Sequence, residues 1–337
     1  MLNYSDIFKK ATIIRNGAVL LGKSVVCDAH VKRPLRIVTH VHWDHLLGLT
    51  KSIKECEKIL MTPASQDSIK ILRGEQLGSS EKIQALPYEK SFEYQNEEIT
   101  FYPAGHIFGS AQVLVETEDN VRIVYTGDFK LPQAESILSD ILVMEATYGN
   151  PENIRKFKRE IEDELISLVK ESLPKKPVWI LGFHGKLQEI LALLQKEKFE
   201  VPIVLQDKIY KMAKVCQRYG LKLGGYISAS SSEGEKLIQR KKPFLALFHA
   251  KSEREIPLNG IKITLSGWEF EKPVRRIGED EWVVAFSDHS DFEQLLEYVE
   301  KSKPQFVITD NYRVGDAPAL AKEIEKRLGI PAGPRPV

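Results

Sequence analysis

Four potential metal ligands lie within six residues of this chain. The stretch THVHWDH, which begins at Thr39, contains all of them: His40, His42, Asp44 and His45. The whole chain has eight histidines in 337 residues, so this density is far above a random scatter over a surface loop. Imidazoles and carboxylates are among the side chains with which proteins bind zinc. The stretch therefore predicts a metal site.

The elements around this stretch must hold the ligands in place. The apolar run at residues 35–38 (LRIV) predicts a buried strand that leads into it. On an extended backbone, His40 and His42 project to the same side. A helix is expected from residues 46–49 onward. The predicted metal site thus follows the carboxyl end of a strand.

Later strands end in the same kind of residue. Strands are expected at residues 98–102, 121–125 and 141–144, and they lead to His106, Asp128 and Glu145. Any one of these alone would suggest a turn residue or a helix cap. Together with the stretch above, they indicate one shared site at the rim of a sheet. For His30, which follows another expected strand, a supporting or surface role is favoured over metal binding.

Composition restricts the class of protein. The apolar fraction of 42%, the charged fraction of 28% and the net charge of +1 describe a globular protein without a strongly basic field. No run approaches the roughly 20 apolar residues of a membrane span, and the N-terminus lacks the pattern of a secretory signal. The three cysteines have no pairing pattern, which favours a reducing cytoplasm. We expect a cytoplasmic protein with no membrane partner.

The pattern of elements changes after residue 150. Expected helices (153–172 and 186–198) alternate with short strands (178–181, 201–205 and 243–248), which is typical of a parallel α/β module. A strand at 282–286, a helix at 292–302, a strand at 305–309, a helix at 317–328 and a Pro-rich tail follow. The module is interpreted as an insertion packed on the first half, with the active site expected in a cleft between them.

These motifs together resemble the metallo-β-lactamase superfamily, and within it the β-CASP nucleases. The superfamily resemblance is carried by the HxHxDH stretch at residues 40–45, His106 and Asp128. The β-CASP resemblance is carried by Glu145 in EATYG, by GKLQE at residues 185–189, by SGW at 266–268 and by His289 in FSDHSDF. The resemblance covers nearly the whole chain. It implies an α/β fold, a four-layer αβ/βα sandwich with an inserted α/β β-CASP cap: core at 1–149, cap at 150–275 and core again at 276–337.

The resemblance also implies roles for the residues. His40, His42 and His106 would hold one zinc ion, Asp128 would bridge, and Asp44 and His45 would hold a second ion, for which Mn²⁺ or Mg²⁺ is an alternative. Asp44 would take the proton of the attacking water. His289, placed by Glu145, would be the general acid for the leaving oxygen.

One departure from the family concerns the second metal site. In the RNA-cleaving branch a histidine follows the last core strand, whereas residues 307–313 here (VITDNYR) contain none. Either Asp310 substitutes as an oxygen ligand, or the second site is weak or empty. In the DNA-repair branch, which also lacks this histidine, residues matching Lys186, Ser266 and Ser287 line a pocket for a terminal phosphate. A solvated surface lysine is an equal alternative for Lys186.

The sequence is compatible with three functions. The first is a zinc-dependent nuclease acting on DNA in end processing or repair, favoured by the compact chain and the missing histidine. The second is the same machinery acting on RNA. The third is a catalytically silent homologue that binds nucleic acid. The insertion disfavours a small-molecule hydrolase.

Overall fold

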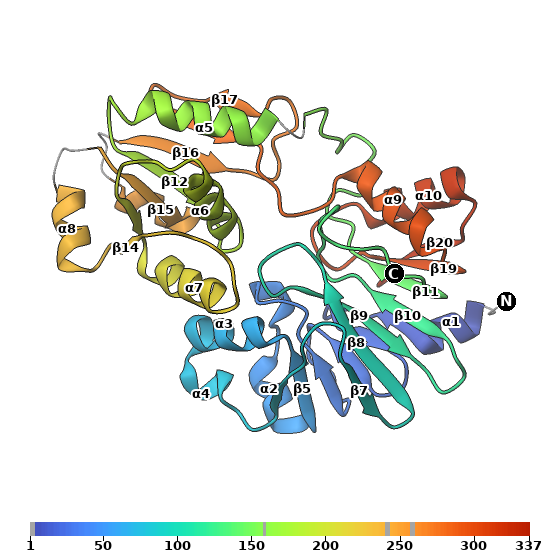
Figure 1. The fold of residues 1–337 in the computed structure, drawn as a ribbon. Coiled ribbons are helices and arrows are strands. Elements are labelled where there is room, and N and C mark those ends of the chain that lie inside the picture. The colour runs from blue at the N-terminus through green and yellow to red at the C-terminus, as the bar shows by residue number, and fades with distance from the viewer. Residues whose placement is uncertain (1–3, 158–159, 240–242, 257–259) are drawn as a thin grey trace. The chain divides into compact units, whose positions relative to one another are not determined.

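The computed structural model describes residues 4–157, 160–239, 243–256 and 260–337. The chain divides into two compact units (Figure 1). The first unit combines residues 1–154 with 289–337, and the second comprises 155–288. Among the described residues, no helix combines the length and apolar character needed to cross a membrane. The three cysteines are buried and unpaired.

The first unit contains two sheets. One sheet runs in chain order: β1 (Ala11–Ile13), β2 (Val19–Leu21), β3 (Val25–Cys27), β4 (Leu35–Ile37), β5 (Lys58–Met61) and β6 (Ile83–Ala85). The other has the order β20-β19-β11-β10-β9-β8-β7, with strands β7 (Ser91–Tyr94), β8 (Glu97–Pro103), β9 (Ala111–Glu116), β10 (Arg122–Tyr125), β11 (Ile141–Met144), β19 (Phe306–Asp310) and β20 (Ala332–Arg335).

Alternating side chains place the core between the two sheets. Val25 and Cys27 of β3 join one apolar cluster with side chains of the second sheet, such as Ile123 and Val143, whereas Val26 belongs to a separate cluster. This two-residue period is the signature of strands with one face on a core. Since both sheets contribute to the cluster, they pack face to face.

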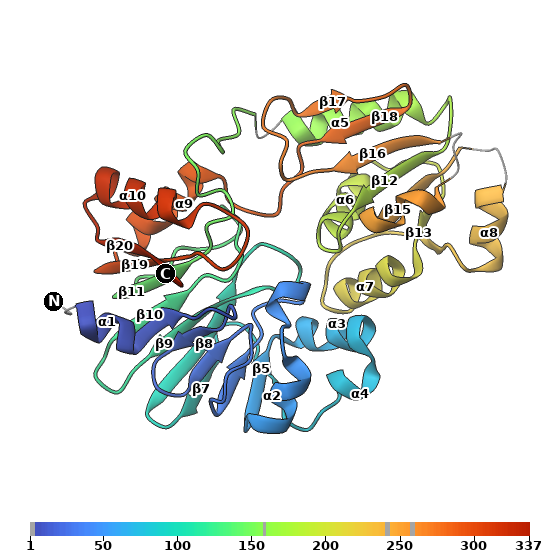
Figure 2. The same cartoon turned by 180° about the vertical axis from the view of Figure 1, so that it is seen from behind.

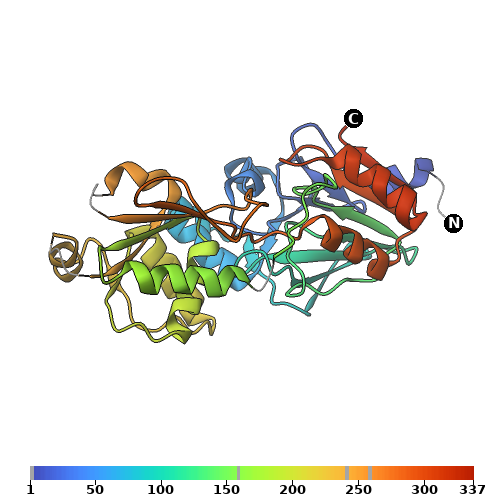
Figure 3. The ribbon, with the colours of Figure 1, turned by 90° about the horizontal axis from the view of Figure 1, so that it is seen from above.

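Helices cover the outer faces. Buried residues of α9 (Phe292–Ser302) and α10 (Ala317–Leu328) form a third cluster with the second sheet, and these helices lie side by side in Figure 3. On the first sheet, the buried Arg36 donates to Ser52 Oγ of α2 (Leu49–Glu55) at 2.8 Å. The remaining helices of the unit are α1 (Tyr4–Lys10), η1 (Trp43–His45), α3 (Pro63–Arg73) and α4 (Glu75–Gly78). The unit is the predicted four-layer αβ/βα sandwich.

The second unit is a seven-stranded sheet of order β14-β13-β15-β12-β16-β18-β17, seen from behind in Figure 2. All pairs are parallel except β17 with β18. The strands are β12 (Val178–Gly182), β13 (Ile203–Leu205), β14 (Ile227–Ser228), β15 (Leu245–His249), β16 (Ile261–Leu265), β17 (Val274–Arg276) and β18 (Glu281–Val284). The helices are α5 (Glu160–Ser172), α6 (Lys186–Lys196), α7 (Asp207–Arg218), α8 (Ser232–Gln239) and η2 (Ala250–Glu255). The predicted parallel α/β module is therefore present.

Three sequence predictions differ from the structure. The return to the first unit comes at residue 289 rather than 276, because β17 and β18 join the sheet of the second unit. The helix expected at 153–172 is helical from Glu160, and residues 158 and 159 of that expectation lie outside the described part. The Pro-rich tail forms β20, which pairs with β19 at the edge of its sheet, the place where a strand tolerates proline.

Candidate metal centre

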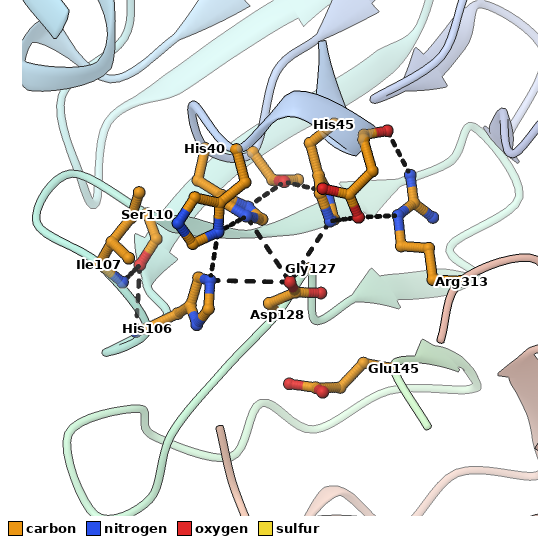
Figure 4. Close-up of polar contacts among 12 residues, drawn as sticks. His40, His45, His106, Ile107, Ser110, Gly127, Asp128, Glu145 and Arg313 are labelled. Atoms are coloured by element: carbon orange, nitrogen blue, oxygen red, sulfur yellow. Dashed lines mark hydrogen bonds and ion pairs between the residues drawn. The ribbon is translucent and has the colours of Figure 1, made fainter. Parts of the chain in front are cut away.

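Three imidazoles and a carboxylate converge at the carboxyl ends of strands in the first unit. Ligand atoms of His40, His42, His106 and Asp128 all lie within 4.8 Å of one another. His42 Nδ1 is 3.2 Å from His40 Nε2 and 2.9 Å from His106 Nε2. Figure 4 shows His40, His45 and His106 directed toward Asp128. The structure thus brings together residues that are up to 88 positions apart in the sequence.

A glycine allows the two strand ends to approach each other. Gly127 has a φ of 54°, in the left-handed region that L side chains rarely adopt. A Cβ there would lie 3.2 Å from the Thr39 Cβ and 3.1 Å from the Ala111 carbonyl oxygen. The Thr-Gly-Asp turn after β10 therefore places Asp128 against the loop that carries His40.

Asp128 is the electrostatic centre of the cluster. Its Oδ2 lies 3.6 Å from Nε2 of His40, 3.4 Å from Nε2 of His45 and 3.6 Å from Nε2 of His106. Burial alone would raise the pKa of Asp128, but the neighbouring imidazoles, His45 above all, hold that pKa well below its ordinary value. Burial and the adjacent imidazoles lower the pKa of His40 well below its ordinary value. Both shifts favour a charged carboxylate on Asp128 and a neutral imidazole on His40.

These groups fit a divalent metal ion. Metal binding requires ionised carboxylates and neutral imidazoles, which are the states that these pKa shifts favour for Asp128 and His40. Three imidazole nitrogens with one carboxylate form a donor set suited to zinc. In addition, Nε2 of His45 is buried and makes no hydrogen bond to any described residue, although it lies 3.3 Å from Asp44 Oδ2.

Asp28 supports this cluster through hydrogen bonds. Its carboxylate is fully buried and accepts hydrogen bonds from His45 Nδ1 (2.7 Å), the Tyr125 hydroxyl (2.9 Å) and the Thr39 backbone N–H (2.9 Å). The bond from Nδ1 fixes the tautomer of His45 and turns Nε2 toward Asp128. Asp28 is therefore a positioning residue for the cluster.

We expect Asp28→Asn to weaken metal binding by about 10- to 100-fold, the range typical of residues that orient metal ligands. Asparagine suits the left-handed backbone at this position, where φ is 65°, so the change mainly removes the charge that faces His45. Competition with a chelator of known affinity measures the effect. The exposed Asp119→Asn variant provides the matched control. An affinity equal to that of the unmodified protein would contradict the role given to Asp28.

Glu145 and His289 form a second pair beside the cluster. His289 Nδ1 donates to Glu145 Oε2 at 2.8 Å, and the other oxygen, Oε1, accepts from the Phe129 N–H at 2.7 Å. Ligand atoms of Asp128, Glu145 and His289 lie within 4.8 Å of one another. Nδ1 of His289 is therefore engaged by Glu145.

Arg313 lies on the His45 side of the cluster (Figure 4), and it forms ion pairs with Asp44 and Asp310. Arg313 Nη1 is 2.6 Å from Asp310 Oδ2, and its Nε is 3.6 Å from Asp44 Oδ2. Burial alone would lower the pKa of Arg313, but Tyr125, Asp310 and Asp28 raise it well above its ordinary value. Asp310, expected as an alternative metal ligand, is thus paired with a buried guanidinium.

The three residues predicted to contact a terminal phosphate lie in the second unit. Lys186 follows β12, Ser266 follows β16 and Ser287 follows β18, and these three strands are neighbours in one parallel sheet. Their carboxyl ends therefore meet at one edge, as at many ligand sites of α/β sheets. Lys186 Nζ lies 3.2 Å from Asp288 Oδ1, so its charge already has a partner. The phosphate role remains a prediction.

Sequence reasoning assigned no role to Asp28, Tyr125 or Arg313. Asp28 directly follows a buried strand, which is the same signal that identified Asp128 and Glu145, and it could have been found in this way. Tyr125 and Arg313 have no comparable signal. For His30, the ring nitrogens contact Ser52 Oγ (2.9 Å) and Glu55 Oε2 (3.1 Å) of α2, which agrees with the supporting role favoured above.

Similar sequences place the chain among known proteins. It is 26% identical over 296 residues to a probable DNA ligase of Opitutus terrae, covering 84% of this chain but 27% of the relative. It is 35% identical over 138 residues to an uncharacterized protein in the lig 3′ region of Acidianus ambivalens, covering 40% of this chain and 99% of the relative. It is 24% identical over 364 residues to an RNase J-like protein of Methanocaldococcus jannaschii, covering 88% and 85%. Further relatives are named as ribonucleases or as a cleavage and polyadenylation factor. The chain belongs to the β-CASP family of the metallo-β-lactamase superfamily.

The comparison with solved structures shows a similar fold only. A crystal structure of a protein of unknown function from Enterococcus faecalis superposes with a TM-score of 0.60 at 15% identity, covering 82% of this chain and 74% of that one. No family model matches the sequence. The chain spans about a quarter of the probable DNA ligase that it matches, so this β-CASP protein corresponds to one part of that relative.

Proposed function

We propose that this β-CASP protein is a metal-dependent nuclease that hydrolyses phosphodiester bonds of nucleic acid. The observation that carries the proposal is the cluster of His40, His42, His106 and Asp128 within 4.8 Å, with the Glu145–His289 pair beside it. A divalent ion bound there, most simply Zn²⁺, would act as a Lewis acid on the phosphate and generate a nucleophilic hydroxide at neutral pH. His40, His42, His106 and Asp128 would hold it.

Two side chains of the protein each carry out one of the two proton transfers. Asp44 is half exposed beside the cluster, with Oδ2 3.3 Å from His45 Nε2, and it accepts the proton of the attacking water. His289 donates a proton from Nε2 to the leaving oxygen, while Glu145 fixes the ring through Nδ1. The two groups therefore serve opposite ends of the reaction.

We propose DNA as the substrate, with single strands or strand ends as the form that is cleaved. One relative, named a probable DNA ligase, supports DNA, and another is named only for its place in the lig 3′ region. The residues after β19 contain no histidine, in contrast to the pattern expected of the RNA-cleaving branch. RNA is the second candidate, because several relatives are named as ribonucleases.

Matched labelled DNA and RNA oligonucleotides, incubated with and without chelator, test the proposal. We expect chelator-sensitive cleavage with DNA preferred. A strong preference for RNA would overturn the choice of DNA in favour of the second candidate. Binding without cleavage of either would favour a catalytically silent homologue. Parallel digests of 5′-phosphorylated, 5′-hydroxyl and circular DNA would show whether an end is required and which end is used.

An exposed tryptophan between two predicted metal ligands is suited to contact a nucleic-acid base. Trp43 stands between His42 and Asp44 on η1, and its side chain is 67% exposed. The Arg73 guanidinium lies 3.9 Å from the centre of its ring. An aromatic face next to a cation is the usual combination for binding single-stranded nucleic acid.

Trp43→Ala should raise the KM for a single-stranded oligonucleotide by about 5- to 100-fold, because stacking of one base contributes about 1–3 kcal/mol. Trp43→Phe, which keeps an aromatic ring, should stay close to the unmodified protein. Steady-state kinetics on one labelled oligonucleotide compares the three proteins. A KM unchanged in the alanine variant would show that no base stacks there.

A further inference from the structure

The guanidinium of Arg313 is buried at the edge of the metal cluster. The residue follows β19, and only 8% of its side chain is exposed. It belongs to the first unit, like the cluster itself. Arginine carries a permanent positive charge, so a full cation stands here whatever else binds.

Two carboxylates face this cation. Asp310 Oδ2 accepts from Nη1 at 2.6 Å, and Asp44 Oδ2 lies 3.6 Å from Nε. Nη2 is also 3.5 Å from the Asp44 carbonyl oxygen and 3.4 Å from the Gly17 carbonyl oxygen. The guanidinium therefore donates a hydrogen bond to Asp310 and lies within ion-pair distance of Asp44, while Nη2 faces the backbone and Nε makes no hydrogen bond to any described residue.

Both oxygens of the Asp310 carboxylate already accept hydrogen bonds. Besides the guanidinium, its carboxylate accepts from the backbone N–H of Tyr312 at 2.9 Å and from that of Arg313 at 3.3 Å. The Asp310 carboxylate is 2% exposed, so breaking the pair would leave a buried charge without its partner. This arrangement opposes the use of Asp310 as a metal ligand.

The Arg313 guanidinium therefore already supplies a positive charge beside the residues that would hold a second metal ion. Asp44 and His45 are the expected ligands of that ion, and Asp44 is within 3.6 Å of the guanidinium. A divalent ion bound to Asp44 would lie close to the buried guanidinium of Arg313, and the two positive charges would repel each other at short range. Removing the guanidinium would uncover Asp310.

We propose that the Arg313 guanidinium takes the place of the second metal ion, so that the centre binds one divalent ion, at His40, His42, His106 and Asp128. The inference rests on the metal centre of the proposed function. In this arrangement Arg313 is a positioning residue: it orients Asp44 toward the cluster and neutralises Asp310. Charge that a second ion would supply comes from the side chain instead.

Metal stoichiometry tests the proposal without reference to activity. Chelator-treated protein is titrated with Co²⁺, bound cobalt is followed by visible absorption, and metal per chain is measured by elemental analysis after gel filtration. We expect one ion per chain for the unmodified protein and for Arg313→Lys, which keeps the cation. Arg313→His replaces the cation with a neutral imidazole and should bind two ions. Arg327→His, on the exposed face of α10, is the matched control and should bind one.

Two results would overturn the proposal. One is two ions per chain in the unmodified protein, a measurement that needs no variant to fold. The other is a single ion in Arg313→His when circular dichroism shows that the variant is folded. The nuclease assay separates this inference from the proposed function: two ions with chelator-sensitive cleavage refutes only the inference, whereas one ion with no cleavage of DNA or RNA refutes only the function.

Discussion

Asp128→Asn is expected to lower phosphodiester cleavage by about a thousandfold or more. The substitution keeps the shape of the side chain but removes the negative charge that lies 3.4–3.6 Å from three imidazoles. The stabilisation supplied by a metal Lewis acid is several kcal/mol, and each 1.4 kcal/mol corresponds to about a tenfold change in rate. Losing a charged ligand removes much of that stabilisation together with part of the metal affinity.

The measurements for this variant are kcat/KM on a labelled oligonucleotide and metal content per chain. Asp119→Asn, a change of the same kind at an exposed carboxylate paired with Lys10, should leave both within about twofold. A variant that keeps its metal and its rate would show that Asp128 is not a ligand. Circular dichroism establishes that the comparison is between folded proteins.

His289→Ala should lower cleavage of a natural phosphodiester by about 10²- to 10⁴-fold, the usual contribution of a general acid. The proposed role is compatible with the position of His289: Nδ1 is held by Glu145 at 2.8 Å, and the ring lies 4.5 Å from that of His106, centre to centre. Without the imidazole, the leaving oxygen must depart without a proton from the protein.

A substrate that needs no proton distinguishes this role from a structural one. The p-nitrophenyl ester of thymidine 5′-phosphate releases a stabilised phenolate, so on this substrate His289→Ala should recover most of its relative rate. His30→Ala removes another imidazole held by a carboxylate, at 3.1 Å from Glu55, and should leave both substrates unaffected. Equal losses on both substrates would argue that His289 supports the site without donating a proton.

Local sequence patterns were sufficient to predict the residues of the cluster. Glu145 directly follows the fully apolar β11, Asp128 comes three residues after the mostly apolar β10, and the parallel pairing of β10 with β11 brings the ends of these strands to one edge. His40 and His42 follow β4 in the same way, although β4 belongs to the other sheet. A polar residue after a buried strand is a local signal, so it can be read without knowing how the sheets pack.

Features that depend on tertiary pairing could not be predicted in this way. The alternation of strands and turns does not reveal which sheet a strand joins. The sequence therefore predicts the end of the second unit at 276, whereas β18, which follows that position, pairs with β16 of the second unit. Tyr125 and Arg313 become part of the site only because both approach Asp28 or Asp44 through space. Nothing in the residues next to them indicates that approach.

The central claim is that His40, His42, His106 and Asp128 hold a metal ion that enables phosphodiester hydrolysis. The most direct test follows cleavage of a labelled single-stranded DNA oligonucleotide while chelator-treated protein is reloaded with zinc in measured steps. We expect no cleavage by the metal-free protein and a rate that rises in proportion to bound metal until one ion per chain. Cleavage by the metal-free protein, or a fully loaded protein that cleaves neither DNA nor RNA, would contradict the claim.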